Sequence, residues 1–276
     1  SALRDGAIGM LQTRWTGYFG NPTILDGNAE QAVAYIRAAA SFWNPQAPIS
    51  EEVAARRYYD AWARMSYRPI AGKLVDIEPW VTRSLVDLDG SGWLGKGPDY
   101  DLSRLVEPQV DGSIVRLGPY LFHLSGAVMT RANRGIARDL PGSITIPINA
   151  RGAALVVLHA AAWGAPAPGQ VVGTYTITYE DGTRLRRKLR YGREIAAWTD
   201  LPLQSLRRYP AWRGTTRSGL GVALDAFPIE NPHPEKVLRS LTVESQGGWT
   251  SPAVVGLTLL DEMPPLPPLP KEDEAR

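Results

Sequence analysis

Short runs of hydrophobic residues, many of them alternating with polar ones, fill most of the chain after Pro69. Six runs have the length and the β-branched or aromatic content of strands, and clusters of turn-forming residues separate them. They cover residues 143–149, 153–159, 171–180, 184–191, 237–245 and 253–261. Asp181 and Gly182 lie between two of these runs, where we expect a two-residue hairpin turn. Because no helical periodicity intervenes, the pattern predicts a β-sandwich.

A different periodicity governs the first 66 residues. Residues 7–15 form a short apolar run with a polar end, which predicts a strand. Apolar residues recur at helical spacing over residues 28–43, and Asn44-Pro45 predicts the end of that helix. Ser50 is placed to begin a second helix. A strand followed by helices forms a βα unit, which cannot bury both its faces alone.

The composition narrows the classes of function. The chain is 44% hydrophobic and 21% charged, which is typical of a folded protein, and its 27 Gly and 23 Pro favour many turns. A net charge of +2 argues against nucleic-acid binding by the molecule as a whole. The absence of Cys excludes disulfides, thiolate metal sites and Cys nucleophiles. No apolar stretch has the length of a membrane span, and the sequence does not indicate a cellular location.

The order of turn and core motifs in the β-region resembles a known module. These motifs are DGSGWLGKG around Trp93, YDLSRL at 100–105, GPYLF at 118–122, LVVLH at 155–159, GTYTITYEDG at 173–182, YG at 191–192, IAAW at 195–198 and NP at 231–232. They look like the galactose-binding-like module at the C-terminus of many large bacterial glycoside hydrolases. The resemblance covers about residues 75–261. It implies a jelly-roll β-sandwich and speaks to the fold more than to a ligand.

The N-terminal part is similar to the last βα unit of a hexosaminidase-type (β/α)8 barrel. The matching residues are GMLQTRW at 9–15 and the FWN at 42–44 that ends the first helix. The resemblance implies that the chain is the C-terminal part of a longer enzyme. The paired catalytic carboxylates of such a barrel sit on an earlier strand, which this chain does not contain. We therefore expect no catalytic residues here, and whether the chain acts as an enzyme stays open.

These observations together predict a mainly-β protein, a jelly-roll β-sandwich preceded by a short α-helical segment. Residues 1–68 are assigned to the end of the catalytic barrel and its connecting helices, and residues 69–262 to the galactose-binding-like sandwich. Residues 263–276, Pro-rich and then charged, are expected to form a disordered tail. The expected function is that of an accessory part of a glycoside hydrolase, which braces the barrel and binds carbohydrate. The alternative is a stand-alone, non-catalytic carbohydrate-binding or adhesion module.

Trp15 follows the polar strand end formed by Gln12 and Arg14. The resemblance to hexosaminidase-type hydrolases implies that a Trp at this place walls the sugar pocket, because active sites of such barrels lie at the C-terminal ends of the strands. Trp15, Gln12 and Arg14 are therefore candidate substrate-binding residues. The alternative is that Trp15 packs at a junction between domains.

Two Trp residues in Gly-rich loops are candidates for carbohydrate binding by the sandwich. Trp93 is flanked by Asp89 and Asp99, whose carboxylates could accept hydrogen bonds from sugar hydroxyls. Trp163 lies in a loop rich in Gly and Pro. The alternative is that both indoles fill the ends of the sandwich.

The sequence contains only weak matches to metal-binding motifs. Asp87, Asp89 and Ser91 have the spacing that begins a calcium loop, but Pro98 stands where the bidentate carboxylate would be needed, so a turn is the simpler interpretation. A different calcium site that includes Asp99 and Asp101 stays open. The three His residues are far apart in sequence, so no metal and no cofactor is expected.

Residues 184–190 carry a row of basic side chains. Arg184, Arg186, Lys188 and Arg190 alternate, so they share one face of a strand, while Leu185 and Leu189 point the other way with Arg187. A solvated sheet face is one interpretation. A patch for an acidic glycan or an acidic partner domain is the other, with Trp198 and Trp212 as additional stacking surfaces. The expected partners of the chain are carbohydrate and the upstream barrel, with no nucleic acid and no membrane.

Overall fold

The computed structural model describes residues 37–40, 50, 53–54, 71–106, 114–164, 166–199 and 209–263. The chain divides into two compact units, the larger of which comprises residues 68–201 and 208–264 and contains every described strand. The predicted strand at residues 7–15, most of both predicted helices and nearly all of the predicted tail lie outside the described residues. Within them, Ser50 begins a helical turn as expected, since its hydroxyl accepts a hydrogen bond from the Val53 N–H at 3.2 Å.

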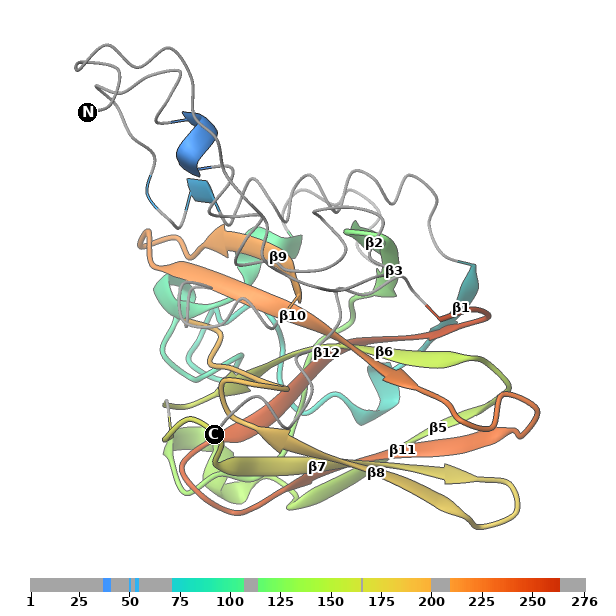
Figure 1. Ribbon diagram of the computed structural model, residues 1–276. Helices are drawn as coiled ribbons and strands as arrows, with labels where there is room; N and C mark the ends of the chain where they lie inside the picture. The colour runs from blue at the N-terminus through green and yellow to red at the C-terminus, as the bar shows by residue number, and fades with distance from the viewer. Residues whose placement is uncertain are drawn as a thin grey trace. The chain divides into compact units, whose positions relative to one another are not determined.

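Two antiparallel sheets and a small hairpin make up the larger unit (Figure 1). The six-stranded sheet has the order β1 (Gly72–Val75), β12 (Ser251–Leu260), β6 (Ala154–Ala162), β10 (Gly221–Glu230), β9 (Tyr209–Thr215), with β4 (Val128–Met129) paired to β12. The four-stranded sheet has the order β5 (Ser143–Ala150), β11 (Leu238–Ser245), β7 (Val171–Tyr179), β8 (Arg184–Arg190). The hairpin pairs β2 (Ile114–Leu117) with β3 (Tyr120–His123). The mainly-β, sandwich-type prediction is confirmed, whereas the jelly-roll connectivity stays a prediction.

The four-stranded sheet is apolar on one face and polar on the other. Ile146 and Ile148 of β5 alternate with exposed neighbours, and Leu241 and Val243 of β11 alternate with neighbours that are half-buried or exposed. Their side chains join those of β6, β10 and β12 in one buried cluster between the sheets, together with Tyr175, Ile177 and Tyr179 of β7. The alternation therefore fixes which face of this sheet is buried, because a shift by one residue would turn every apolar side chain outward.

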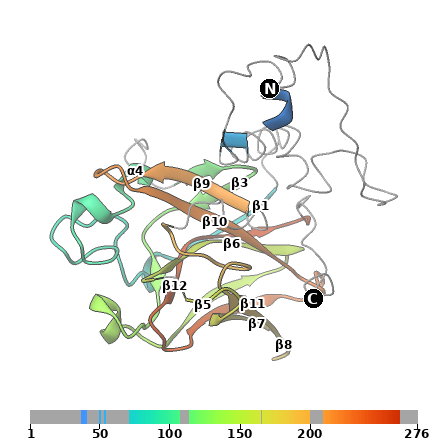
Figure 2. The ribbon, with the colours of Figure 1, turned by 60° about the vertical axis from the view of Figure 1, so that its left-hand side comes forward.

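The six-stranded sheet is buried on both faces at its centre. Every residue of β6 and β12 is buried, as expected for strands that are apolar without alternation. The face turned away from the four-stranded sheet is covered in part by the β2–β3 hairpin, whose Phe122 is fully buried. The Thr258 hydroxyl of β12 donates a hydrogen bond to the Leu121 carbonyl of that hairpin. Figures 1 and 2 both show β3 on the side of this sheet opposite β7 and β8.

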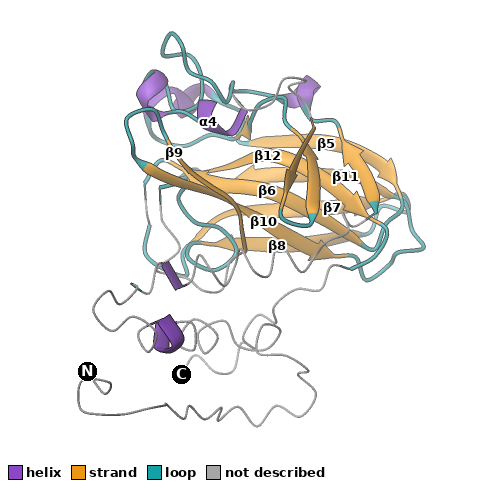
Figure 3. Ribbon diagram, turned by 90° about the horizontal axis from the view of Figure 1, so that it is seen from above, coloured by secondary structure: helices purple, strands orange, loops and turns teal. Residues whose placement is uncertain are grey.

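Helical turns lie in several connections of this unit. They are η1 (Glu78–Trp80), η2 (Pro98–Tyr100), α4 (Ser103–Val106) and η3 (Gly135–Asp139). The short α4 contacts the edge strand β9, beside which it lies in Figure 3. Leu102 and Leu105 of this segment are buried. The loops and helical turns of residues 77–106, called the loop layer below, are therefore packed into the core.

The predicted strands agree closely with the observed ones. Each of the six predicted runs matches an observed strand to within three residues at either end. The hairpin turn between β7 and β8 differs from the prediction, because its loop has three residues. The Gly182 N–H donates to the Tyr179 carbonyl at 3.0 Å and the Tyr179 N–H donates to the Thr183 carbonyl at 2.9 Å. Gly182 has a φ of 82°, so this is a tight turn followed by a glycine bulge.

Gly173 of β7 marks a place where the two sheets approach closely. A Cβ atom there would lie 2.5 Å from Pro252 Cγ of β12 and 2.7 Å from the Glu244 carbonyl oxygen of β11. We predict that Gly173→Ala lowers the free energy of unfolding by about 1–3 kcal/mol, because the sheets must move apart. Chemical denaturation measures this change.

Gly142 supplies the matched control for that substitution. It has an unstrained φ and no heavy atom within 4 Å of a Cβ built on it. Gly142→Ala is therefore expected to leave the stability unchanged or slightly higher. Equal stabilities of the two variants would mean that the sheets are not in contact at Gly173.

Candidate functional site

A pocket of about 470 Å³ opens at one end of the sandwich, where β7 begins and β11 ends. Its walls come from the β4–β5, β6–β7 and β11–β12 connections. The lining residues are Arg134, Gly164, Pro166, Gln170, Val171, Val172, Gln246, Gly248, Trp249 and Thr250. Its volume lies within the range of ligand sites, about 300–1,000 Å³.

Hydrogen bonds to neighbouring segments hold the β11–β12 connection in place. The Gly247 N–H donates to the Ser245 hydroxyl oxygen at 3.0 Å, and the Gly248 carbonyl accepts from the Asn133 N–H at 2.8 Å. The Thr250 hydroxyl donates to the Trp163 carbonyl at 3.1 Å. Three segments far apart in sequence are thus tied together around the pocket. The site is preorganised by its backbone.

Trp249 gives the pocket its most distinctive surface. Its side chain is 68% exposed, which is a large apolar exposure for a residue held by its neighbours on both sides. The Arg134 guanidinium lies 5.4 Å from the Trp249 ring centroid, a cation–π distance that orients the indole. The amides of Gln170 and Gln246 are exposed beside it. The pocket therefore combines an aromatic stacking surface with several hydrogen-bonding groups.

The polar lining of the pocket carries positive charge. Arg134 contributes a guanidinium with five N–H donors, and no Asp or Glu is among the lining residues. The Thr250 hydroxyl already donates its proton to the Trp163 carbonyl. A ligand that supplies acceptor oxygens, such as an amide carbonyl or a carboxylate, suits this lining better than one that supplies donors alone.

The chain matches none of the family models, curated proteins or solved structures with which it was compared. The function is therefore argued from the geometry of the site.

Trp163, a predicted carbohydrate-binding residue, lies next to this pocket but is 7% exposed. Its backbone has a positive φ of 66°, which turns the chain sharply at the end of β6. Lys96 Nζ lies 6.0 Å from the Trp163 ring centroid. Trp163 thus supports the pocket through its carbonyl and its position, while its indole is largely covered.

Trp93, the other predicted indole, is fully buried. Its ring makes an edge-to-face contact with Trp198, with centroids 5.5 Å apart, so it packs in the loop layer. Trp198 is buried as well and presents no stacking surface to a ligand. Neither Trp93 nor its flanking carboxylates line the pocket.

The acidic residues around Trp93 organise its loop. Asp89 is exposed and accepts hydrogen bonds from the Ser91 N–H and hydroxyl, which lower the pKa of the Asp89 carboxyl. Asp99 is also exposed, and its carbonyl accepts from the Ser218 hydroxyl at 2.8 Å. The buried Asp87 accepts from the Gly92 and Gly97 N–H groups at 3.1 and 3.0 Å. This is the turn that the sequence favoured over a calcium loop.

Asp101, a residue of the alternative calcium site, also makes hydrogen bonds to the backbone of this loop. Its carboxylate accepts from the Asp87 and Ser103 N–H groups at 2.9 and 3.0 Å. In the described part of the chain, no three His, Asp or Glu side chains are grouped so that they could hold a metal ion. None of the helices described there is long and apolar enough to cross a membrane.

The predicted barrel-type site cannot be examined in the same way, since Gln12, Arg14 and Trp15 lie outside the described residues. His159 is a core residue. Its Nδ1 lies 2.8 Å from the Tyr175 hydroxyl oxygen, and its ring stacks on Phe227. Both His159 and Tyr175 are fully buried, and burial raises the pKa of Tyr175 well above its usual value. This pair is inaccessible to a substrate.

Sequence reasoning missed Trp249. The signal was present, because Gly247 and Gly248 precede it between two predicted strands. A Trp in a short, Gly-rich β-connection has few local neighbours to cover it, and loops carry binding residues more often than strands.

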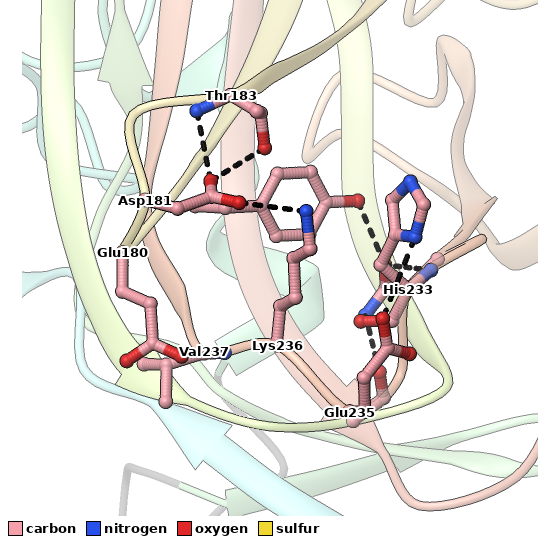
Figure 4. A network of polar contacts seen from close by, with 10 residues as sticks. Glu180, Asp181, Thr183, His233, Glu235, Lys236 and Val237 are labelled. Carbon is pink, nitrogen blue, oxygen red and sulfur yellow. Dashed lines mark hydrogen bonds and ion pairs between the residues drawn. The ribbon is translucent and has the colours of Figure 1, made fainter.

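A polar network lies at the opposite end of β7 from the pocket, about 27 Å away along the strand (Figure 4). The Asp181 carboxylate accepts hydrogen bonds from Lys236 Nζ at 2.7 Å and from the Thr183 hydroxyl at 2.6 Å. Asn231 accepts from the Tyr179 hydroxyl at 2.7 Å and donates to the Gly152 carbonyl at 2.7 Å. The network fastens the β10–β11 connection to the β7–β8 hairpin. The polar groups of the network form hydrogen bonds with one another, which indicates a structural role for this end of the sandwich.

We predict that Trp93→Ala lowers the free energy of unfolding by about 3–5 kcal/mol, the usual effect of removing a large aromatic side chain from a core. Denaturant unfolding of the variant measures it. Trp249→Ala is the matched control and is expected to change stability by less than about 0.5 kcal/mol, because Trp249 is exposed. A Trp93 variant as stable as the parent protein would contradict the packed loop layer.

The Asp181–Lys236 pair predicts a pH-dependent contribution to stability. Hydrogen bonds from Lys236 and Thr183 hold the pKa of Asp181 well below its usual value in the folded state. The stabilisation is therefore complete above about pH 4, the ordinary pKa of Asp. It is lost as the pH falls through the lower folded pKa.

Lys236→Met should therefore lower the melting temperature slightly at pH 7, and the difference from the parent protein should shrink below about pH 4. Melting curves at a series of pH values check this, with Lys73→Met as the control for loss of an exposed charge. A difference that stays constant down to pH 3 would show that Lys236 acts only through packing against the Tyr179 ring, 5.7 Å away.

Proposed function

We propose that the β-sandwich is a carbohydrate-binding accessory module of a bacterial glycoside hydrolase and that the pocket beside Trp249 is its sugar site. The observation that carries this proposal is an exposed indole at the mouth of a polar pocket formed by ordered loops. Such a combination of one aromatic surface with a few oriented polar groups is typical of small-ligand sites.

A pyranose ring suits this surface chemically. Its C–H groups form an apolar face that can stack on the Trp249 indole, while its hydroxyls project around the rim of the ring. Gln170, Gln246 and Arg134 stand around the indole as hydrogen-bonding partners for those hydroxyls. The cation–π contact from Arg134 limits the orientations of the indole, which reduces the entropy lost when a sugar stacks on it.

The donor-rich lining indicates the kind of sugar. With no carboxylate among the lining residues, the pocket favours a ligand with an extra acceptor, and the N-acetyl carbonyl of an amino sugar supplies one. This choice agrees with the resemblance of residues 9–15 to a hexosaminidase-type barrel. The same sandwich is proposed to brace that barrel. A stand-alone binding or adhesion module would use the same pocket.

A titration with N-acetylglucosamine oligomers tests the sugar site. We predict that the Trp fluorescence of the full chain shifts with the oligomer and that Trp249→Ala abolishes at least nine-tenths of the shift. Trp249→Phe keeps an aromatic face and is expected to weaken binding by less than about tenfold, since most of the stacking surface remains.

The melting temperature of each variant is the control for folding. It should stay at the parent value, because the changed side chain is exposed. Binding of the oligomer that is unchanged in Trp249→Ala would overturn the assignment of the site. Binding of galactosides but not of N-acetyl sugars would keep the site and change the sugar class.

A further inference from the structure

The outer face of the four-stranded sheet carries a regular array of polar side chains. Across the order β5, β11, β7, β8, backbone pairing places its residues in three rows. The rows are Pro147–Ser240–Thr178–Arg184, Thr145–Thr242–Thr176–Arg186 and Ser143–Glu244–Thr174–Lys188. Each row thus ends in a cation on the edge strand β8.

The middle of the array consists of hydroxyl groups. The half-buried Thr174 and Thr178 and the buried Thr176 lie directly beside the cations, and the half-buried Thr242 follows on the next strand. The Oγ1 atoms of Thr145 and Thr242 lie 2.9 Å apart, so at least part of the array is ordered by its own hydrogen bonds. Neighbouring strands are about 4.8 Å apart, so the donors and acceptors of this face are closely spaced.

The cations at the edge have no acidic partner among the described residues. Arg184, Arg186 and Lys188 are all exposed, and no ion pair to any of them is found there. The chain pairs comparable cations elsewhere. Arg190 of the same strand bonds Glu194 at 2.8 Å, and Lys236 bonds Asp181 at 2.7 Å. Two nearby cations thus have acidic partners, whereas the three on this face have none among the described residues.

Three like charges at every second position of one strand repel one another, since successive members are only about 6.7 Å apart along the strand. Protection of an edge strand against aggregation explains the presence of charge on β8. It does not require that all charges on β8 have one sign, nor that a grid of hydroxyls lies beside them. The one acidic residue of the three rows, Glu244, lies two strands away from Lys188. A bound polyanion relieves the repulsion and uses both features.

We propose that this face binds an anionic polysaccharide, carboxylated or sulfated, along β8. The guanidinium and ammonium groups pair with its acidic groups, and the Thr rows bond its hydroxyls. The face suits other polyanions less well. It has no aromatic side chain to stack a nucleic-acid base, and Pro147 is the one apolar side chain among the residues of the three rows, too little for a protein interface core.

This site is separate from the pocket and does not depend on the proposed sugar site there. Binding of the full chain to polygalacturonate and to heparin is measured at low and high salt, with neutral dextran as the reference. We predict binding to at least one of the two anionic polymers but not to dextran, weakened severalfold by 0.5 M salt. The triple variant Arg184→Gln, Arg186→Gln, Lys188→Gln should lose at least about tenfold in affinity, as expected from three lost charge contacts.

A charge-matched variant makes the test specific. Lys73→Gln, Arg138→Gln and Arg151→Gln remove the same charge from exposed positions outside this face, and affinity is expected to stay within twofold. Trp249→Ala should also leave polyanion binding unchanged, which separates this proposal from the pocket. Equal losses in the two triple variants would overturn it, because net charge alone would then explain binding. Failure to bind either polymer, or equally tight binding of DNA or of anionic lipid vesicles, would overturn it too.

Discussion

The burial of the six-stranded sheet on both of its faces is the constraint on which the rest of the structure depends. β6 and β12 are apolar at nearly every position, so neither face of their centre can meet water. One face is covered by the four-stranded sheet and the other in part by the β2–β3 hairpin. The described residues 77–106 and 114–140, although poor in regular structure, therefore help to complete the core.

This constraint decides which surfaces are left for function. The loop layer uses its aromatic residues internally, as the contact between Trp93 and Trp198 shows. The hairpin end of the sandwich uses its polar groups in the network around Asp181 and Asn231. Two surfaces in the described part of the chain keep groups without such internal partners. One is the pocket with the exposed Trp249, and the other is the outer face of the four-stranded sheet.

The strands with strict alternation or continuous apolar character could be predicted from the sequence, because their burial pattern is local. β10 was harder to recognise, since Asp225 and Pro228 interrupt its apolar run and are placed by pairing with β6 and β9. The same limit of sequence-based prediction applies to the candidate site. Trp93 and Trp249 each follow a Gly-rich turn, yet one is covered by Trp198, which lies 105 residues away, and the other is not covered. Only long-range packing distinguishes the two.

The central claim is that the proposed sugar site lies at the pocket end of the sandwich and not at the loop layer around Trp93. Hydrogen–deuterium exchange of the full chain, with and without N-acetylglucosamine oligomers, tests it most directly. The account predicts slower exchange over residues 163–172 and 246–250 with the sugar present, and unchanged exchange over residues 84–101. Protection confined to residues 84–101 would contradict it.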